Sequence, residues 1–141
     1  MNSIKGSCFC EQMQFEITGE VPDLYQCHCS ECRKTTGSSA NAGFLINKTQ
    51  FNWLQGAENR KDFVKDSGYQ LSFCKTCGSP VPNLTAVKKD LMWIPAGLLD
   101  NPPSSMKVGA HIFIDSKANW DDISGQAKQY ASTPTSIDEL L

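Results

Sequence analysis

Seven cysteines fall into three short clusters, and this clustering constrains the fold more than any other feature of the 141-residue sequence. The clusters are Cys8-Phe9-Cys10, Cys27-His28-Cys29-Ser30-Glu31-Cys32 and Cys74-Lys75-Thr76-Cys77. Cysteines that only fill a core need no such spacing, because a small apolar thiol packs wherever there is room. An odd number also weakens a disulfide interpretation, since cytosolic thiols are kept reduced. The clusters therefore favour metal ligation.

Local geometry groups four of the cysteines into one closed site. In an extended strand residues i and i+2 point to the same face, so Cys8 and Cys10 aim at one point. A C-x-x-C turn brings two sulfurs around one metal, and Gly78 after Cys77 can take the positive φ that such a loop needs. The expected ligands of a structural zinc are Cys8, Cys10, Cys74 and Cys77.

The other three cysteines, Cys27, Cys29 and Cys32, form a set of three rather than four. Zinc with four protein ligands is structural, whereas zinc with three protein ligands and an open position is catalytic. We therefore expect a second, open zinc site here. Two alternatives stay open, namely a pairing of this cluster with Cys74 or Cys77 and a fourth ligand from His28 or His111.

Composition and charge exclude several classes of protein. Hydrophobic residues make up 40% and charged residues 20% of the chain, as in ordinary globular domains. The net charge is −2 and no basic run exceeds two residues, which disfavours nucleic-acid binding. The longest apolar stretch, residues 91–99, contains Pro95 and Gly97 and is too short to cross a bilayer. We expect a cytoplasmic protein, because residues 1–10 also lack the apolar region of a signal peptide.

Short strands separated by glycine and proline predict a β-rich fold in a single domain spanning residues 1–141. Residues 13–18 alternate apolar and polar side chains, the period of a half-buried strand. Ser30 is a candidate N-cap for a short helix through Lys34 that ends at Gly37. Pro80 and Pro82 indicate an edge or irregular segment. Further strands are expected around Tyr25 and Cys27, at 42–46, 51–54, 61–64 and 69–73, at 84–87 and 91–94 as a hairpin, and at 108–114. From Ser124 the chain is a polar tail with a last helical turn from Ser136.

The ordered motifs carry a resemblance to a known family. They are Gly6-Ser7-Cys8-Phe9-Cys10, Cys27 to Lys34 followed by Gly37-Ser38, Phe73 to Ser79, and the later pieces 96–100, 111–113 and 118–120. Together they resemble the glutathione-dependent formaldehyde-activating enzyme family, also called the centromere protein V/GFA domain. The likeness covers about residues 3–130. It departs at Glu11, where the family commonly has glycine, and at Pro80 and Pro82.

The resemblance implies a mainly β, Mss4-like zinc-binding β-sandwich of short antiparallel strands with one or two short helices. It also implies two Zn²⁺ sites with the ligand division reached from spacing. The implied activity is that of a carbon–sulfur lyase, similar to S-hydroxymethylglutathione synthase, acting on adducts of glutathione or another small thiol with formaldehyde or another small aldehyde. A site with three thiolates suits such a substrate, because coordination deprotonates an incoming thiol.

Arg33 and Lys34, next to the ligand Cys32, are candidate contacts for substrate carboxylates, with ordinary solvated surface as the alternative. Two other functions remain open. The domain is a non-catalytic, zinc-stabilised binding module if both metals are structural. Alternatively, Cys27, Cys29 and Cys32 form a redox-sensing or metal-sensing site, which predicts reversible loss of metal on mild oxidation.

Overall fold

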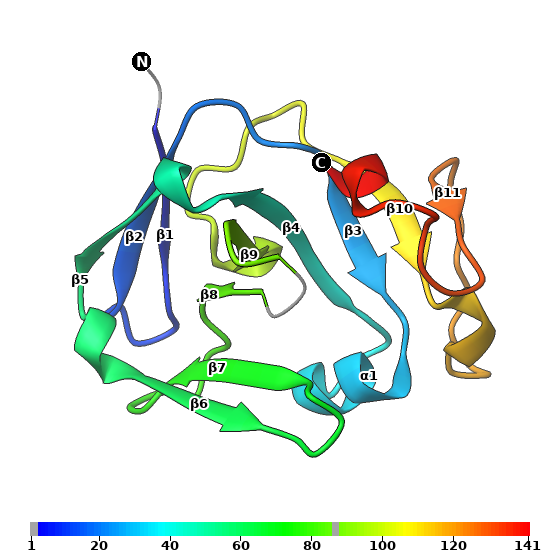
Figure 1. The fold of residues 1–141 in the computed structure, drawn as a ribbon, viewed down its shortest axis with the longest axis horizontal. Coiled ribbons are helices and arrows are strands. Elements are labelled where there is room, and N and C mark those ends of the chain that lie inside the picture. Colours follow the sequence, from blue (N-terminus) through cyan, green and yellow to red (C-terminus); the bar gives the residue numbers. More distant parts are fainter. Residues whose placement is uncertain (1–2, 86–87) are drawn as a thin grey trace.

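The computed structural model describes residues 3–85 and 88–141, and its architecture is mainly β, as expected (Figure 1). Among the described residues there is a single α-helix, α1 (Ser30–Thr36). The strands in chain order are β1 (Ser3–Ser7), β2 (Gln14–Thr18), β3 (Leu24–Cys27), β4 (Asn41–Asn47), β5 (Phe51–Gln55), β6 (Arg60–Val64), β7 (Gln70–Cys74), β8 (Asn83–Leu84), β9 (Leu91–Pro95), β10 (Val108–Ile112) and β11 (Lys128–Gln129). Short 3₁₀ turns lie at Lys48–Gln50, Ala57–Asn59, Ala96–Leu98, Ile114–Ser116 and Ile137–Leu140. Within the described parts of the chain, no helix has the length and apolar character needed to cross a membrane.

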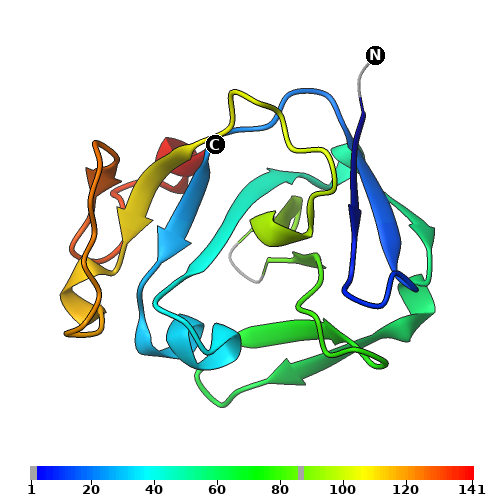
Figure 2. The ribbon, with the colours of Figure 1, turned by 180° about the vertical axis from the view of Figure 1, so that it is seen from behind.

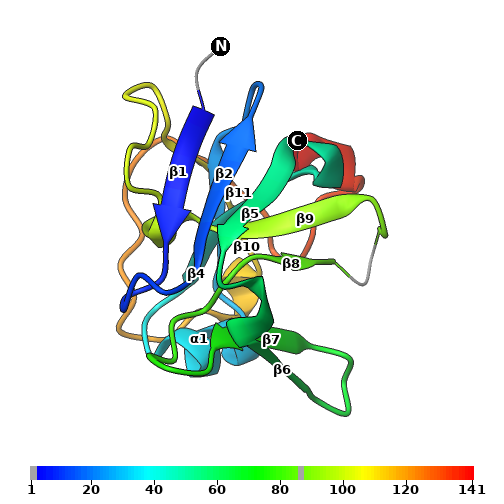
Figure 3. The same ribbon diagram turned by 90° about the vertical axis from the view of Figure 1, so that its left-hand side faces the viewer.

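Three sheets surround the interior, as the views from behind and from the side make clear (Figures 2 and 3). Their strand orders are β1-β2-β5, β11-β10-β3-β4-β9-β8 and β6-β7. Most neighbouring strands are antiparallel, but β10 runs parallel to β3 and β11 runs parallel to β10. The parallel pairs differ from the expected antiparallel arrangement. A strand's own sequence pattern does not specify the direction of a partner far away in the sequence.

The main core lies between the three-stranded and six-stranded sheets. Phe15 and Ile17 alternate with less buried residues along β2, as its sequence pattern predicts, and they pack with Phe44 and Ile94 of β4 and β9. The Phe15 ring also lies directly over the backbone at Gly6, where an added Cβ would come within 2.1 Å of the ring. This close approach explains why β1 carries a glycine. The same glycine weakens the strand pattern, and β1 was not predicted.

Helix α1 begins one residue earlier than expected. Its N-cap is Cys29 rather than Ser30, because the Cys29 sulfur accepts a hydrogen bond from the backbone N–H of Cys32. The helix extends to Thr36, and Gly37 ends it in the left-handed conformation with φ 65°, as its sequence predicts. The fold therefore uses a cysteine as a cap, which places its sulfur at the start of the helix.

Several predicted boundaries shift by a few residues. The expected strand at 108–114 ends at Ile112, because Phe113 has a positive φ of 59° and turns the chain into a 3₁₀ turn. The expected hairpin is present as the antiparallel pair β8–β9, with Leu84 opposite Met92. The remainder of its first strand includes residues 86–87, which lie outside the described residues. Ser136 does cap a last 3₁₀ turn, as predicted.

Candidate metal centres

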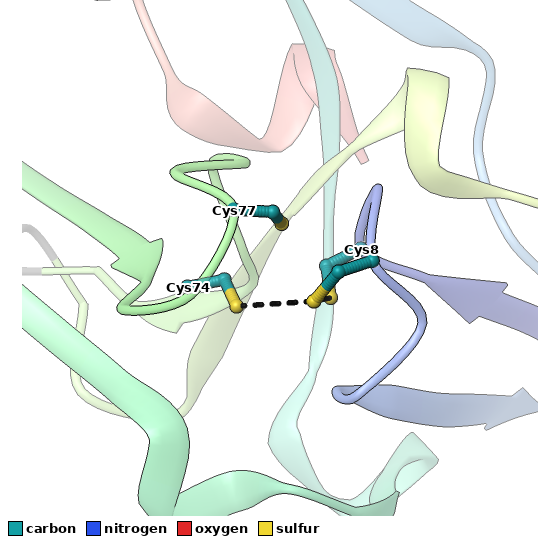
Figure 4. A group of neighbouring side chains, drawn as sticks. Cys8, Cys74 and Cys77 are labelled. Carbon is teal, nitrogen blue, oxygen red and sulfur yellow. Dashed lines mark hydrogen bonds between the residues drawn. The ribbon is translucent and has the colours of Figure 1, made fainter.

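The first group of thiols joins two distant parts of the chain. Cys8 and Cys10 lie in the turn between β1 and β2, Cys74 ends β7, and Cys77 lies in the turn that follows. Their four sulfurs all lie within 4.8 Å of one another. Figure 4 shows Cys8 on one side and Cys74 and Cys77 on the other pointing into the same space. The fold thus brings together the four residues that the spacing grouped.

The geometry of this group fits a zinc ion. Zinc–sulfur bonds of about 2.3 Å in a tetrahedral site place neighbouring sulfurs about 3.8 Å apart. The sulfur of Cys10 lies 3.6 Å from that of Cys8 and 3.8 Å from that of Cys74. The backbone N–H of Met13 donates to the Cys8 sulfur at 3.4 Å, and the Asn59 amide donates to the Cys74 sulfur at 3.2 Å. Such donors stabilise thiolates, the form in which cysteine binds metal.

One thiol of this group is especially acidic. Burial alone would raise the pKa of Cys77, but hydrogen bonding with the side chain and backbone of Ser79 outweighs it, and together with other nearby groups it lowers that pKa to about 6. Gly78, next to Cys77, has a φ of 79°, the left-handed conformation expected for the residue after C-x-x-C. The loop therefore curls its backbone toward the sulfurs.

The second group is local in sequence. Cys27 ends β3, Cys29 caps α1, and Cys32 lies in the first turn of that helix. Their three sulfurs also lie within 4.8 Å of one another, and Ile112 of β10 packs against them. This group contains three potential ligand residues from the described chain, and Cys74 and Cys77 belong to the other group. Three converging thiols suit zinc, a metal that readily takes thiolate ligands.

The pKa values of Cys27 and Cys32 are shifted in opposite directions. A hydrogen bond from the Cys27 thiol is the main cause that lowers the pKa of Cys32 to about 6, and the Tyr69 hydroxyl contributes. The same pairing with Cys32, together with burial, raises the pKa of Cys27. The Tyr69 oxygen lies 3.3 Å from the Cys32 sulfur. Burial raises the pKa of Tyr69, so its hydroxyl stays protonated and able to donate.

The two histidines are buried and paired with each other rather than with the sulfurs. The His28 Nε2 and His111 Nδ1 atoms are 2.9 Å apart, and His28 Nδ1 lies 2.8 Å from the Asp121 carboxylate. Neither histidine belongs to a metal-ligand group within residues 3–85 and 88–141. The His28 side chain is therefore directed toward His111 and Asp121.

A cavity of about 220 Å³ lies beside the second group, with Cys27 and Cys32 in its wall. Tyr25 of β3, Thr35 of α1 and Tyr69 of the β6–β7 hairpin contribute to the same wall. The cavity gives a small molecule access to two of the three sulfurs. The second group therefore combines converging thiols with adjacent space for a small molecule.

The candidate substrate contacts Arg33 and Lys34 lie elsewhere on α1. The Arg33 guanidinium donates to the carbonyl oxygen of Ser116 at 3.4 Å, and its Nε is buried with no hydrogen-bond partner among the described groups. Lys34 is exposed. Neither residue is among the described residues that line the cavity.

Tyr69 and Asp121 are functional candidates that sequence reasoning missed. The strand predicted at 69–73 includes Tyr69, whose hydroxyl oxygen reaches the Cys32 sulfur across 37 residues of sequence. Asp121 reaches His28 across 93 residues. No local pattern marks either contact, because both depend on how distant elements pack.

Comparisons with known proteins found a matching family and a similar fold. Residues 3–116 match the model of a family described as glutathione-dependent formaldehyde-activating enzyme. A crystal structure of a protein from Rhodobacter sphaeroides is similar, with a TM-score of 0.58 and 21% sequence identity over 71% of this chain and 91% of that one. At this identity the likeness concerns the fold alone. No curated protein matches the chain.

Proposed function

Because the chain belongs to the glutathione-dependent formaldehyde-activating enzyme family, we propose that it is a zinc-dependent carbon–sulfur lyase-type enzyme. Its substrates are a small thiol such as glutathione and a small aldehyde such as formaldehyde, together with their adduct. The observation that carries the proposal is the convergence of Cys27, Cys29 and Cys32 beside a cavity that reaches two of their sulfurs.

Two zinc ions are part of this proposal. Cys8, Cys10, Cys74 and Cys77 would hold a structural zinc in a closed site, and Cys27, Cys29 and Cys32 would hold a second one. When bound at the second site, zinc supplies an open coordination position at which a thiol is held in its deprotonated form. The protein's own residues then decide what reaches that position and how it is oriented.

The proposed reaction forms a carbon–sulfur bond and opens the carbonyl π bond. The thiol sulfur adds to the carbonyl carbon, the carbonyl π bond opens, and the proton lost by the thiol ends on the former carbonyl oxygen; the reverse direction cleaves the carbon–sulfur bond. The hydroxyl of Tyr69 lines the cavity 3.3 Å from the Cys32 sulfur. We assign its single O–H as the donor that turns from the Cys32 sulfur to this oxygen as negative charge develops there.

Arg33 and Lys34 remain candidate contacts for parts of the substrate that extend out of the cavity. Both lie within two residues of Cys32 in the sequence. Their positive charges would offset part of the negative charge of a three-thiolate site, although exposed charges act weakly in water. All seven cysteines are free thiols, which suits the cytoplasmic location that we propose.

Metal analysis and a thiol titration test the proposal together. Elemental analysis of protein purified without added metal should give close to two zinc per chain. Glutathione should then change the absorption spectrum of protein with cobalt in place of zinc, and the protein should accelerate adduct formation from glutathione and formaldehyde. Cys29→Ala should lose one metal and both responses, while Ser30→Ala, an exposed neighbour of Cys29, should keep them.

Two results would overturn the proposal. A single zinc that stays bound after Cys29→Ala would mean that the second group holds no metal. Two zinc ions with no spectral response to a broad panel of thiols would favour the zinc-stabilised binding module instead.

A further inference from the structure

The wall of the cavity beside Cys27 and Cys32 is built from uncharged groups. Hydroxyl and amide side chains come from several elements, among them Thr35 and Thr36 on α1, Asn41 on β4, and Gln70 and Ser72 on β7. Aromatic rings and aliphatic chains complete the wall. Apart from the two thiols, no described residue that lines the cavity carries a side chain that is charged at neutral pH.

Several charged residues on the elements around the cavity are engaged with other groups. Lys65 lies 3.5 Å from the Glu31 carboxylate, which also accepts a hydrogen bond from Ser67. Arg33 donates to Ser116. Behind the wall, the Asp62 carboxylate accepts a hydrogen bond from the Ser72 hydroxyl at 2.6 Å and is paired with Arg60, whose Nε lies 3.4 Å away.

An anionic group would therefore find no counter-charge in this cavity. Moving a charged group out of water without a partner is costly, whereas uncharged polar groups can be satisfied by hydroxyls and amides. The site's own thiolates add repulsion. The cavity is also small, since pockets for drug-sized ligands measure roughly 300–1,000 Å³.

Building on the proposed function, we propose that this cavity holds the uncharged portion of the substrate next to the sulfur. The site would thus accept small neutral thiols and their aldehyde adducts and discriminate against a carboxylate close to the sulfur. For glutathione, the cysteine side chain and the adjoining amides would enter, while both carboxylates would stay outside the cavity.

A matched pair of thiols tests this inference on the full-length, cobalt-substituted protein. The probes are 3-mercaptopropionamide and 3-mercaptopropionate, which have nearly the same shape and differ in charge. The neutral amide should bind roughly tenfold to a hundredfold more tightly, as followed by the change in cobalt absorption. Equal binding, or tighter binding of the carboxylate, would overturn the inference while leaving the proposed thiol site intact.

Adding a charge to the cavity wall tests whether the wall causes the preference for the neutral thiol. Gln70→Lys places a cation in the cavity and should narrow or reverse the preference for the neutral thiol. As a control, Gln129→Lys adds the same charge at an exposed position on β11, outside the cavity, and should leave this preference unchanged. Each thiol is compared with itself across the variants, so differences in thiol acidity cancel.

If Gln70→Lys does not fold, Thr36→Lys offers the same test from an exposed position in the wall. An unchanged preference in a folded wall variant would mean that the wall does not select, and this part of the inference would fail. No response to either thiol in the parent protein would instead reject the proposed function itself, and the inference with it.

Discussion

Glu11 holds a backbone conformation that side chains other than glycine rarely adopt. Its φ is 66°, and its N–H donates to the Cys8 carbonyl oxygen at 3.0 Å, which closes the turn carrying Cys8 and Cys10. A left-handed residue with a Cβ costs about 1–2 kcal/mol. The family resemblance places glycine here, so the chain carries strain at a turn that positions two candidate metal ligands.

Replacing this residue should relieve the strain. We expect Glu11→Gly to raise the free energy of unfolding by about 0.5–1 kcal/mol, because the relief exceeds the greater entropy that glycine has in the unfolded chain. Urea denaturation of the zinc-loaded protein measures the change. Glu20→Gly removes the same side chain at an exposed site without positive φ and should instead destabilise. A loss of stability in both variants would show that the Glu11 turn stores no strain.

A buried network joins three elements next to the second group of thiols. His28 lies between β3 and α1, His111 lies on β10, and Asp121 follows the 3₁₀ turn at Ile114–Ser116. The His28 backbone N–H also donates to the Ile112 carbonyl oxygen. Because His28 separates Cys27 from Cys29, the network fixes the segment from which both sulfurs project.

Removing the acid from this network should destabilise the packing of these elements. Asp121→Ala leaves a buried imidazole nitrogen of His28 without its partner, which costs about 1–3 kcal/mol in the free energy of unfolding. Asp122→Ala removes the same charge from an exposed neighbour and should change stability by less than about 0.5 kcal/mol. Thermal unfolding at constant pH and ionic strength compares the two. Equal changes in stability for the two variants would show that Asp121 contributes no more than an exposed charge does.

At the scale of the whole molecule, the two groups of thiols differ in what they hold together. The first links the β1–β2 turn to the end of β7, with contacting sulfurs 64 residues apart in sequence. The second lies within Cys27–Cys32, on one strand end and one helix. Metal at the first group therefore closes a long loop of the fold, whereas metal at the second organises a local segment.

This division predicts different outcomes for two similar substitutions. Structural zinc contributes apparent binding energies on the order of 10 kcal/mol, comparable with the whole stability of a domain. Cys74→Ser should therefore abolish cooperative unfolding or cause aggregation. Cys32→Ser should keep the fold and lose the thiol response and any lyase activity. Circular dichroism melts with zinc analysis test both, and equal loss of folding would contradict separate structural and reactive sites.

Much of the fold was readable from local patterns. The alternation in residues 13–18 marked β2, and Gly37 marked the end of α1, because each signal depends on neighbours in sequence. The strand β1 was missed, since its Gly6 is explained by contact with the Phe15 ring on another strand. The parallel pairing of β3 with β10 was missed for the same reason: a partner 80 or so residues away leaves no local mark.

The sequence by itself determined how the cysteines could cluster, because residues two or three apart cannot be far apart in space. It also carried the family likeness, whose motifs are short and ordered. The tertiary structure alone decided what surrounds the sulfurs: Tyr69 against Cys32, Asp121 against His28, and an uncharged wall built from α1, β4 and β7. These contacts depend on long-range packing, and so spacing could group the cysteines as candidate ligands but could not reveal the chemistry of the cavity.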